Sequence, residues 1–364
     1  MESSLSLEEK DQFKIIPLFK YFPNLQDEIA HIQLINSPTP IRKLDLLGEK
    51  LGISKLYCKD DGPSTPFYGG NKCRKLEFLL ADALRKKTKR IITYGTVGSN
   101  HCIATAVSAK SVGIATTVIL TNQPKSEACK TNLLYHTMIG TEIIHASYPE
   151  FAKKTEELIK LYQEKDGVAP YVIPLGGTEE LGTLGTINGA LELVDQIESG
   201  ELPDVDVIYV AAGSFGTAIG IFLGMKLLKR KTEVRSICVC NPKYCSQTKI
   251  NSIVDETILF LKSKGVNLEL TEEIKIEDYF GEGYGVETSE LKEIVDLVFK
   301  LEKITLDHIY TAKSMLAVCN DVQKGELKDK VVLFWRTNNS IDLSQFTSKG
   351  NPDLVPEDFK KYLE

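Results

Sequence analysis

The stretch that decides the fold runs from Gly69 to Asn100 and reads GGNKCRKLEFLLADALRKKTKRIITYGTVGSN. Its two opening glycines and Lys72 form a loop, and the segment 74–86 that follows predicts a helix. Residues 90–97 predict a buried strand, and 99–112 predict a second helix. A loop, a helix, a strand and another helix in this order are typical of a parallel α/β sheet.

The same alternation continues toward the C-terminus. β-Branched runs predict short strands at 116–120, 142–146 and 171–175, with helices at 127–138 and 150–163 between them. A second series follows, with a strand at 205–211, a helix at 217–228 and a strand at 234–240. We therefore predict an α/β protein with open, mostly parallel twisted sheets and helices on both faces.

The length of the chain predicts two domains, because 364 residues exceed the size at which one hydrophobic core usually splits. A strand predicted at 55–60 precedes the lysine loop and is assigned to the second series. The predicted division is a large, cofactor-binding domain of residues 13–74 and 186–364, and a small domain of residues 75–185.

Composition excludes some classes of protein. Hydrophobic residues make up 42% and charged residues 26%, as in an ordinary globular protein. The net charge of -6 argues against a nucleic-acid partner, which would require a basic face. No apolar run reaches the length of a membrane-spanning helix, and Met1–Lys10 has no apolar signal-peptide core. A cytoplasmic location is the expectation.

The eight cysteines are scattered, which does not suggest a disulfide framework. Cys238, Cys240 and Cys245 form the closest cluster, and the first two share one face of a predicted strand. No fourth ligand at zinc spacing follows them. We interpret them as buried reduced thiols and predict no metal site.

Three motifs lie at predicted strand ends or helix starts, where α/β proteins bind ligands. Lys72 follows two glycines at a loop-to-helix junction, where desolvation would lower the pKa of its amine and favour imine formation. Ser99 is placed to cap a helix whose free N–H groups attract an anion. Ala212–Thr217 (AGSFGT) is a glycine-rich turn between a strand and a helix and predicts a phosphate cup.

Each motif taken alone has an ordinary structural interpretation: a solvated lysine, a capping serine, or a glycine turn. Together they indicate a cofactor with one phosphate and one reactive carbonyl. The turn at 212–217 is neither a Walker A loop nor the full dinucleotide pattern.

The combination resembles the D-cysteine desulfhydrase and 1-aminocyclopropane-1-carboxylate (ACC) deaminase family of pyridoxal 5'-phosphate (PLP) enzymes. The resemblance rests on 69–84 (GGNKCRKLEFLLADAL), on Ser-Asn-His at 99–101, on 173–185 (IPLGGTEELGTLG), and on later motifs at 283–286 and 310–313. It extends from about Pro38 to Thr337, in the same order and spacing. It implies the tryptophan synthase β-like fold (fold type II), a small amino-acid substrate and a homodimer.

The resemblance also implies roles for individual residues. Lys72 would carry PLP as a Schiff base, Asn100 would bind the 3'-oxygen of PLP, and Ser99 the substrate carboxylate. Tyr284 and Tyr310 would line the substrate pocket, although two half-buried core tyrosines are the plainer interpretation. The phosphate and the ring would be held by Gly213, Ser214, Gly216, Thr217, Thr311 and Thr337.

Two residues favour the desulfhydrase branch of the family. His101 and Thr311 resemble that branch, whereas the deaminase branch tends to carry Gln and Glu. A hydroxyl at Thr311, beside the pyridine nitrogen, cannot strongly stabilise a protonated ring, which suits a rapid β-elimination. The departures from the family are Phe215, Glu287, Cys102-Ile103-Ala104 and Asn338-Asn339.

The expected function is a PLP-dependent lyase that converts D-cysteine to pyruvate, sulfide and ammonia. The alternatives are an ACC deaminase or another amino-acid lyase or racemase on the same scaffold, and a PLP-binding protein without turnover.

Overall fold

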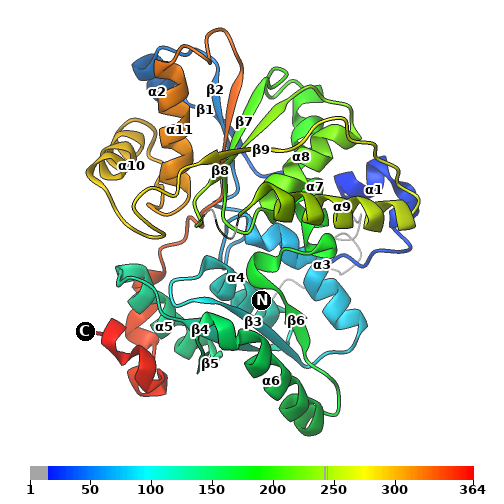
Figure 1. Cartoon of the computed structure of the whole chain (residues 1–364), viewed down its shortest axis with the longest axis vertical. Helices are drawn as coiled ribbons and strands as arrows, with labels where there is room; N and C mark the ends of the chain where they lie inside the picture. The colour runs from blue at the N-terminus through cyan, green and yellow to red at the C-terminus, as the bar shows by residue number, and fades with distance from the viewer. Residues whose placement is uncertain (1–14, 242, 244) are drawn as a thin grey trace, which may run out of the picture.

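The computed structural model describes residues 15–241, 243 and 245–364, so the polar start Met1–Lys10 lies outside the described residues. Two separate sheets form the molecule, one in the upper and one in the lower half of Figure 1. Within the described residues, no helix is both long and apolar enough to cross a membrane.

The larger sheet has six strands: β1 (Ile41–Lys43), β2 (Leu56–Asp60), β7 (Val207–Ala212), β8 (Glu233–Cys238), β9 (Lys275–Asp278) and β10 (Val332–Arg336). Their spatial order is β1-β2-β10-β7-β8-β9, and every pair is parallel except β1 with β2. Six helices accompany this sheet: α1 (Pro17–Tyr21), α2 (Asp45–Leu51), α8 (Gly216–Leu227), α9 (Gln247–Ser263), α10 (Ser289–Glu302) and α11 (Thr311–Gln323).

Helices cover both faces of this sheet. In β7, Ile208 and Val210 belong to the core shared with α8 and α9, whereas Val207 and Tyr209 belong to the core shared with α10 and α11. All six residues of β7 are buried, which is the usual condition of a central parallel strand. The apolar run VIYVAA therefore forms a strand because both of its faces are covered by helices.

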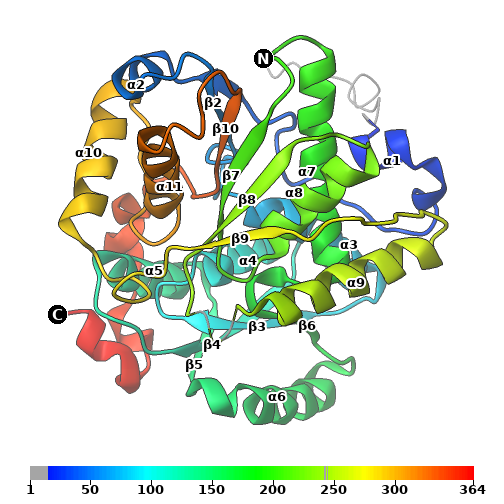
Figure 2. The ribbon, with the colours of Figure 1, turned by 45° about the horizontal axis from the view of Figure 1, so that its top comes forward.

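The smaller sheet has four parallel strands: β3 (Arg90–Thr96), β4 (Ala115–Thr121), β5 (Glu142–His145) and β6 (Tyr171–Ile173). The order is β5-β4-β3-β6. One face packs against α4 (Asn100–Ser111) and α5 (Glu127–Ile139), and the other against α6 (Phe151–Asp166), as Figure 2 shows. Every predicted strand and helix occurs in the structure, with ends within three residues of the prediction.

Two further helices, α3 (Lys72–Arg85) and α7 (Glu180–Glu198), pack closely together and against α8. A Cβ atom on Gly185 of α7 would collide with the backbone carbonyl of Arg74 in α3, and one on Gly220 of α8 would collide with Thr186 of α7. The missing side chains let the three helices approach closely. This packing brings the start of α3, with Lys72, near the start of α8.

A buried charge cluster fixes α3 and α7 to the large sheet. The guanidinium of Arg74 donates to Asp61 at 2.8 Å and to Glu192 at 3.0 Å, and Lys59 of β2 also donates to Glu192, at 2.5 Å. The carboxyl of Glu192 is buried, which opposes ionisation, but Arg74 and Lys59 lower its pKa to about 2. The charges are therefore held as pairs.

All strands of the smaller sheet lie within residues 90–173, inside the predicted small domain. The end of the chain, assigned by prediction to the large domain, packs instead beside this sheet. It consists of three short 3-10 helices, η6 (Leu343–Lys349), η7 (Pro352–Leu354) and η8 (Glu357–Tyr362). Phe359 and Tyr362 share a core with Val118 and Leu120 of β4. The domain boundaries themselves stay a prediction.

Candidate active site

Lys72 is the first residue of α3 and is held by a braced loop. The backbone N–H of Gly70 donates to the carbonyl of Asp61 at 2.8 Å, and the N–H of Asn71 donates to the carbonyl of Thr337 at 3.1 Å. Gly70 has φ +90°, a conformation that favours glycine. Lys72 keeps partial exposure, yet the surrounding protein lowers the pKa of its amine to about 8. A neutral amine is therefore accessible near neutral pH, as the sequence motif predicted.

The turn at 213–217 joins the end of β7 to the start of α8, as predicted. The hydroxyl of Thr178 donates to Ser214 Oγ at 2.7 Å, and the side-chain amide of Asn71 donates to Thr217 Oγ1 at 2.8 Å. The first N–H groups of a helix have no helical partners, so this end of α8 presents donors suited to an anion. The contact with Asn71 ties the turn to the lysine loop.

Phe215 replaces the glycine that is usual in the family, and its backbone conformation is one that favours glycine. It adopts φ 63°, in the left-handed region, and its side chain is buried in the core of the large sheet. A left-handed residue with a side chain costs about 1–2 kcal/mol, and burying a phenyl ring offsets this cost. Phe215 therefore points away from the turn and does not fill it.

Lys75, which the sequence analysis did not select, lies against the same turn. Its ammonium donates to the carbonyl of Gly176 at 3.0 Å and to Thr178 Oγ1 at 3.1 Å, and it would collide with a Cβ atom on Gly216. Burial, and then the charge of Lys72, hold its pKa well below the usual value. The signal in the sequence was its place one helical turn after Lys72, on the same side of α3.

Lys72, Ser214 and Gly176 meet at one point. A Cβ atom on Gly176 would collide with Ser214 Oγ and lie 3.6 Å from Lys72 Nζ. Among the described residues, no carboxylate pairs with Lys72 or Lys75 within 4.0 Å. Two amines without a carboxylate within 4.0 Å, beside a helix N-terminus, fit a ligand with a phosphate group and an aldehyde, which is what PLP offers.

Ser99 caps α4, as predicted, because its Oγ accepts from the N–H of Cys102 at 3.2 Å. Asn100 Oδ1 accepts from the hydroxyl of Tyr68 at 3.2 Å. The next residue, His101, is buried, with Nε2 at 3.0 Å from Thr93 Oγ1. Burial, followed by the charges of Lys72 and Lys75, holds its pKa well below the usual value. The side chains of Cys102, Ile103 and Ala104, which depart from the family pattern, are all buried.

Tyr284 and Tyr310 meet, although they are 26 residues apart. Their hydroxyl oxygens are 2.7 Å apart and their rings pack edge to face. Burial raises the pKa of both hydroxyls, and the mutual hydrogen bond lowers the pKa of Tyr284 while it raises that of Tyr310. The ring of Tyr310 also lies 3.0 Å from the place a Cβ atom of Gly213 would take, so the pair borders the turn.

The hydroxyl of Thr311 is engaged by a residue that the sequence analysis missed. It donates to Asp307 Oδ2 at 2.7 Å, and the backbone N–H of Asp307 donates to it at 2.8 Å. The hydroxyl proton of Thr311 is therefore donated to the carboxylate of Asp307. No contact among the described residues joins Thr311 directly to Lys72.

Of the departures Asn338 and Asn339, only Asn339 has a side-chain hydrogen bond to the lysine loop among the described residues. Asn339 Oδ1 accepts from the N–H groups of Gly69 at 3.2 Å and Ile341 at 2.7 Å. Asn338 accepts from Arg336 Nε at 3.1 Å and donates to the carbonyl of Thr305 at 3.1 Å. The side chain of Asn338 is thus held by Arg336 and Thr305, and that of Asn339 by Gly69 and Ile341.

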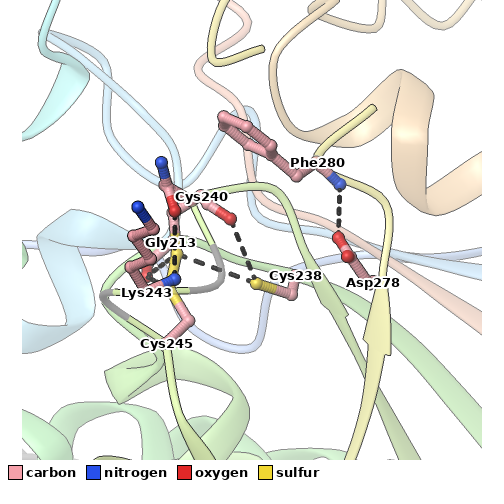
Figure 3. The surroundings of a disulfide bond; sticks show 8 residues. Gly213, Cys238, Cys240, Lys243, Cys245, Asp278 and Phe280 are labelled. Atoms are coloured by element: carbon pink, nitrogen blue, oxygen red, sulfur yellow. Dashed lines mark hydrogen bonds between the residues drawn. A yellow bond between two sulfur atoms is a disulfide. The ribbon is translucent and has the colours of Figure 1, made fainter. Parts of the chain in front are cut away.

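The expectation of reduced thiols was wrong for one pair of cysteines. Cys240 and Cys245 are joined by a disulfide, shown in Figure 3, while Cys238 is a free thiol. Cys240 lies beyond the end of β8 at Cys238, outside the predicted strand, yet the sulfurs of the two residues are 3.7 Å apart. Cys245, seven residues after the end of β8, lies at the same point.

Comparisons with known proteins identify the family of the chain. The model of the family "Pyridoxal-phosphate dependent enzyme" matches residues 32–337. A protein of Pyrococcus abyssi named "Putative 1-aminocyclopropane-1-carboxylate deaminase" is 33% identical over 85% of this chain and 91% of its own length. A protein of the same name in Pyrococcus furiosus is 34% identical over 85% of this chain and 92% of its own length.

Solved structures extend the comparison. A structure described as an "ACC deaminase homologue" has a TM-score of 0.78 and 32% identity, covering 91% of this chain and 98% of that chain. A serine racemase from Dictyostelium discoideum, 17% identical over 90% of this chain and 98% of its own, shares the fold with a TM-score of 0.60. The expected fold type II architecture is thus confirmed. The chain belongs to the family of PLP-dependent enzymes, within the group related to ACC deaminase.

Proposed function

We propose that the protein is a PLP-dependent deaminase that opens the ring of ACC or of a closely similar small amino acid, giving a 2-oxo acid and ammonia. The observation that carries this proposal is the hydroxyl pair of Tyr284 and Tyr310, 2.7 Å apart and next to the Gly213 turn. The names of the relatives support it.

The bound cofactor would supply an electron sink for negative charge at the α-carbon of the substrate. Lys72 would hold the cofactor and move protons at the substrate, since its amine has a pKa of about 8. Ser214, Thr217 and Lys75 would bind the phosphate, and Ser99 with the first turn of α4 would orient the substrate carboxylate. Asn100 would bind the 3'-oxygen of PLP, and Thr337 would lie at the ring.

The tyrosine pair matters because ACC has no hydrogen on its α-carbon. Removal of an α-proton by Lys72 cannot start its reaction, so a second group must attack or protonate the ring carbons. Burial raises the pKa of Tyr284 and the hydrogen bond with Tyr310 opposes this rise, whereas burial and the same bond both raise the pKa of Tyr310. Tyr284 is therefore the better candidate for this second group.

The test is a comparison of ACC with D-cysteine in the PLP-loaded enzyme. We expect 2-oxobutyrate from ACC, and we expect Tyr284→Phe to lower kcat for ACC about 100-fold or more, the usual contribution of an acid–base or nucleophilic group. Tyr310→Phe should have a smaller effect. An unchanged kcat for ACC in Tyr284→Phe, with PLP still bound, would refute the role of the pair.

D-cysteine β-elimination is the second candidate, because Thr311 is a hydroxyl residue where the deaminase branch tends to carry Glu. Two observations reduce its support. His101, the other residue that resembles the desulfhydrase branch, hydrogen-bonds Thr93 inside the protein. Asp307 places a carboxylate 2.7 Å behind the Thr311 hydroxyl, so that hydroxyl is not isolated from negative charge. Faster release of sulfide from D-cysteine than of 2-oxobutyrate from ACC would favour this candidate, and turnover of neither would favour a PLP-binding protein.

A further inference from the structure

The three cysteines beside β8 gather at one point behind the Gly213 turn. The sulfurs of Cys238, Cys240 and Cys245 all lie within 4.8 Å of one another. Cys238 and Cys245 are buried and Cys240 is partly exposed, so the cluster has one open side. Figure 3 shows the three side chains converging from the end of β8 and from the loop that follows it.

We propose that, when the disulfide is reduced, Cys238, Cys240 and Cys245 bind one thiophilic metal ion, Zn²⁺ or Cu⁺, through their three sulfurs. The proposal does not depend on the substrate of the enzyme.

The spacing of the sulfurs fits a single ion. A metal–sulfur bond of about 2.3 Å in tetrahedral geometry separates two ligand sulfurs by about 3.8 Å. Cys238 Sγ and Cys240 Sγ are already 3.7 Å apart. Cys245 is bonded to Cys240, so opening the disulfide frees it to move to the same separation.

The chemistry of the donors selects the kind of metal. Three thiolates are soft ligands that favour Cu⁺ or Zn²⁺ over Mg²⁺ or Ca²⁺, which prefer oxygen. Three thiolates complete a trigonal site for Cu⁺, whereas Zn²⁺ would keep a fourth position for water at the partly exposed Cys240 side. No carboxylate or imidazole of the described residues joins the cluster, so sulfur alone decides the preference.

The disulfide makes the site dependent on the redox state. Two of the three sulfurs are bonded to each other in the oxidised chain and cannot bind a metal as thiolates. Reduction by a dithiol supplies two electrons and two protons: the reductant is oxidised to its own disulfide, and the chain gains two thiols. Metal binding then displaces protons from the thiols.

The experiment uses the full-length protein with PLP bound, reduced with a dithiol and freed of reductant without air. Cd²⁺ serves as the probe because its bonds to thiolate give an ultraviolet charge-transfer absorption. We expect one equivalent of Cd²⁺ in the reduced protein and none after the disulfide is formed again. Zn²⁺ and Cu⁺ are then tested as competitors, and the stronger competitor identifies the ion.

Cys238→Ser is the decisive variant, because it removes a ligand and leaves the disulfide pair intact. We expect at least a tenfold weaker affinity for Cd²⁺ in this variant. Cys319→Ser, which removes a buried thiol on α11, is the matched control and should bind like the unchanged protein. PLP absorbance verifies that each variant is folded. Absence of Cd²⁺ binding in the reduced protein, or equal binding in Cys238→Ser and Cys319→Ser, would overturn the proposal.

Discussion

At the scale of single residues, the candidate site depends on two lysine amines whose surroundings are less polar than water. Lys72 and Lys75 lie one helical turn apart, with no carboxylate partner among the described residues. Burial lowers the pKa of both amines, and the charge of Lys72 lowers that of Lys75 further. Such surroundings favour the neutral form of both amines, and an anion bound beside Lys75 would stabilise its charged form.

This environment predicts the pH dependence of cofactor capture. A folded pKa of about 8 for Lys72 means that the neutral, nucleophilic amine is half populated near pH 8, well below the usual value of 10.5. We expect the rate of covalent PLP capture by the cofactor-free protein to rise with pH and then level off. The midpoint of this rise should lie near pH 8. Borohydride trapping at a series of pH values, with the modified peptide identified by mass spectrometry, measures this. A midpoint near 10, or attachment at another lysine, would contradict the prediction.

At the scale of elements, the N-terminus of α8 is the feature that a mutation can test cleanly. Thr217 lies in its first turn and accepts a hydrogen bond from Asn71 at 2.8 Å. In Thr217→Asp, a carboxylate would occupy the place that the helix dipole and Lys75 offer to a phosphate. We expect PLP affinity to fall at least tenfold, measured by equilibrium dialysis.

Thr217→Asn is the matched control, because it has nearly the same shape as Asp without the charge. It should lose only the hydrogen bond, which is worth about 0.5–1.5 kcal/mol for neutral partners and up to about 3 with a charged one. Equal losses in the two variants would mean that shape, and not charge, decides binding at this turn.

The strands, the helices and the turns between them were predictable because they are local patterns. The run VIYVAA and the turn that follows it carry their signal in adjacent residues. The contacts that involve loop residues carried no such signal, whether their partners are four or twenty-six residues apart in the sequence. Examples are the pairing of Tyr284 with Tyr310, of Thr311 with Asp307, and of Cys240 with Cys245. Each depends on how a loop folds back, which periodicity does not encode.

At the scale of the whole molecule, the buried charges on Arg74, Asp61, Lys59 and Glu192 join the large sheet to α3 and α7. Arg74 lies two residues after Lys72, so the cluster also fixes the start of the helix that carries the site. The carboxylate of Glu192 is the common partner of Arg74 and Lys59. Its loss would leave Arg74 with Asp61 as an ion-pair partner and would remove the carboxylate that opposes the lowering of the Lys59 pKa by burial.

Glu192→Gln should therefore destabilise the protein by about 3–5 kcal/mol at pH 7, the usual result of removing one partner of a buried ion pair. Denaturant unfolding followed by circular dichroism measures this loss. Asp195→Asn, on the same helix, removes a surface partner of Lys20 and should cost less than about 1 kcal/mol. Comparable losses in the two variants would show that the buried cluster contributes no more to the free energy of unfolding than an exposed ion pair does.

The dependence on pH distinguishes the lost charge from altered packing. The pKa of Glu192 is about 2 in the folded protein and near 4.5 when unfolded, so its ionisation stabilises the fold fully above about pH 5. This contribution declines as the pH falls from about 5 toward 2. The difference in unfolding free energy between the unchanged protein and Glu192→Gln should narrow over the same interval. A difference that stayed constant from pH 6 to pH 3 would assign the effect to packing, because packing does not titrate.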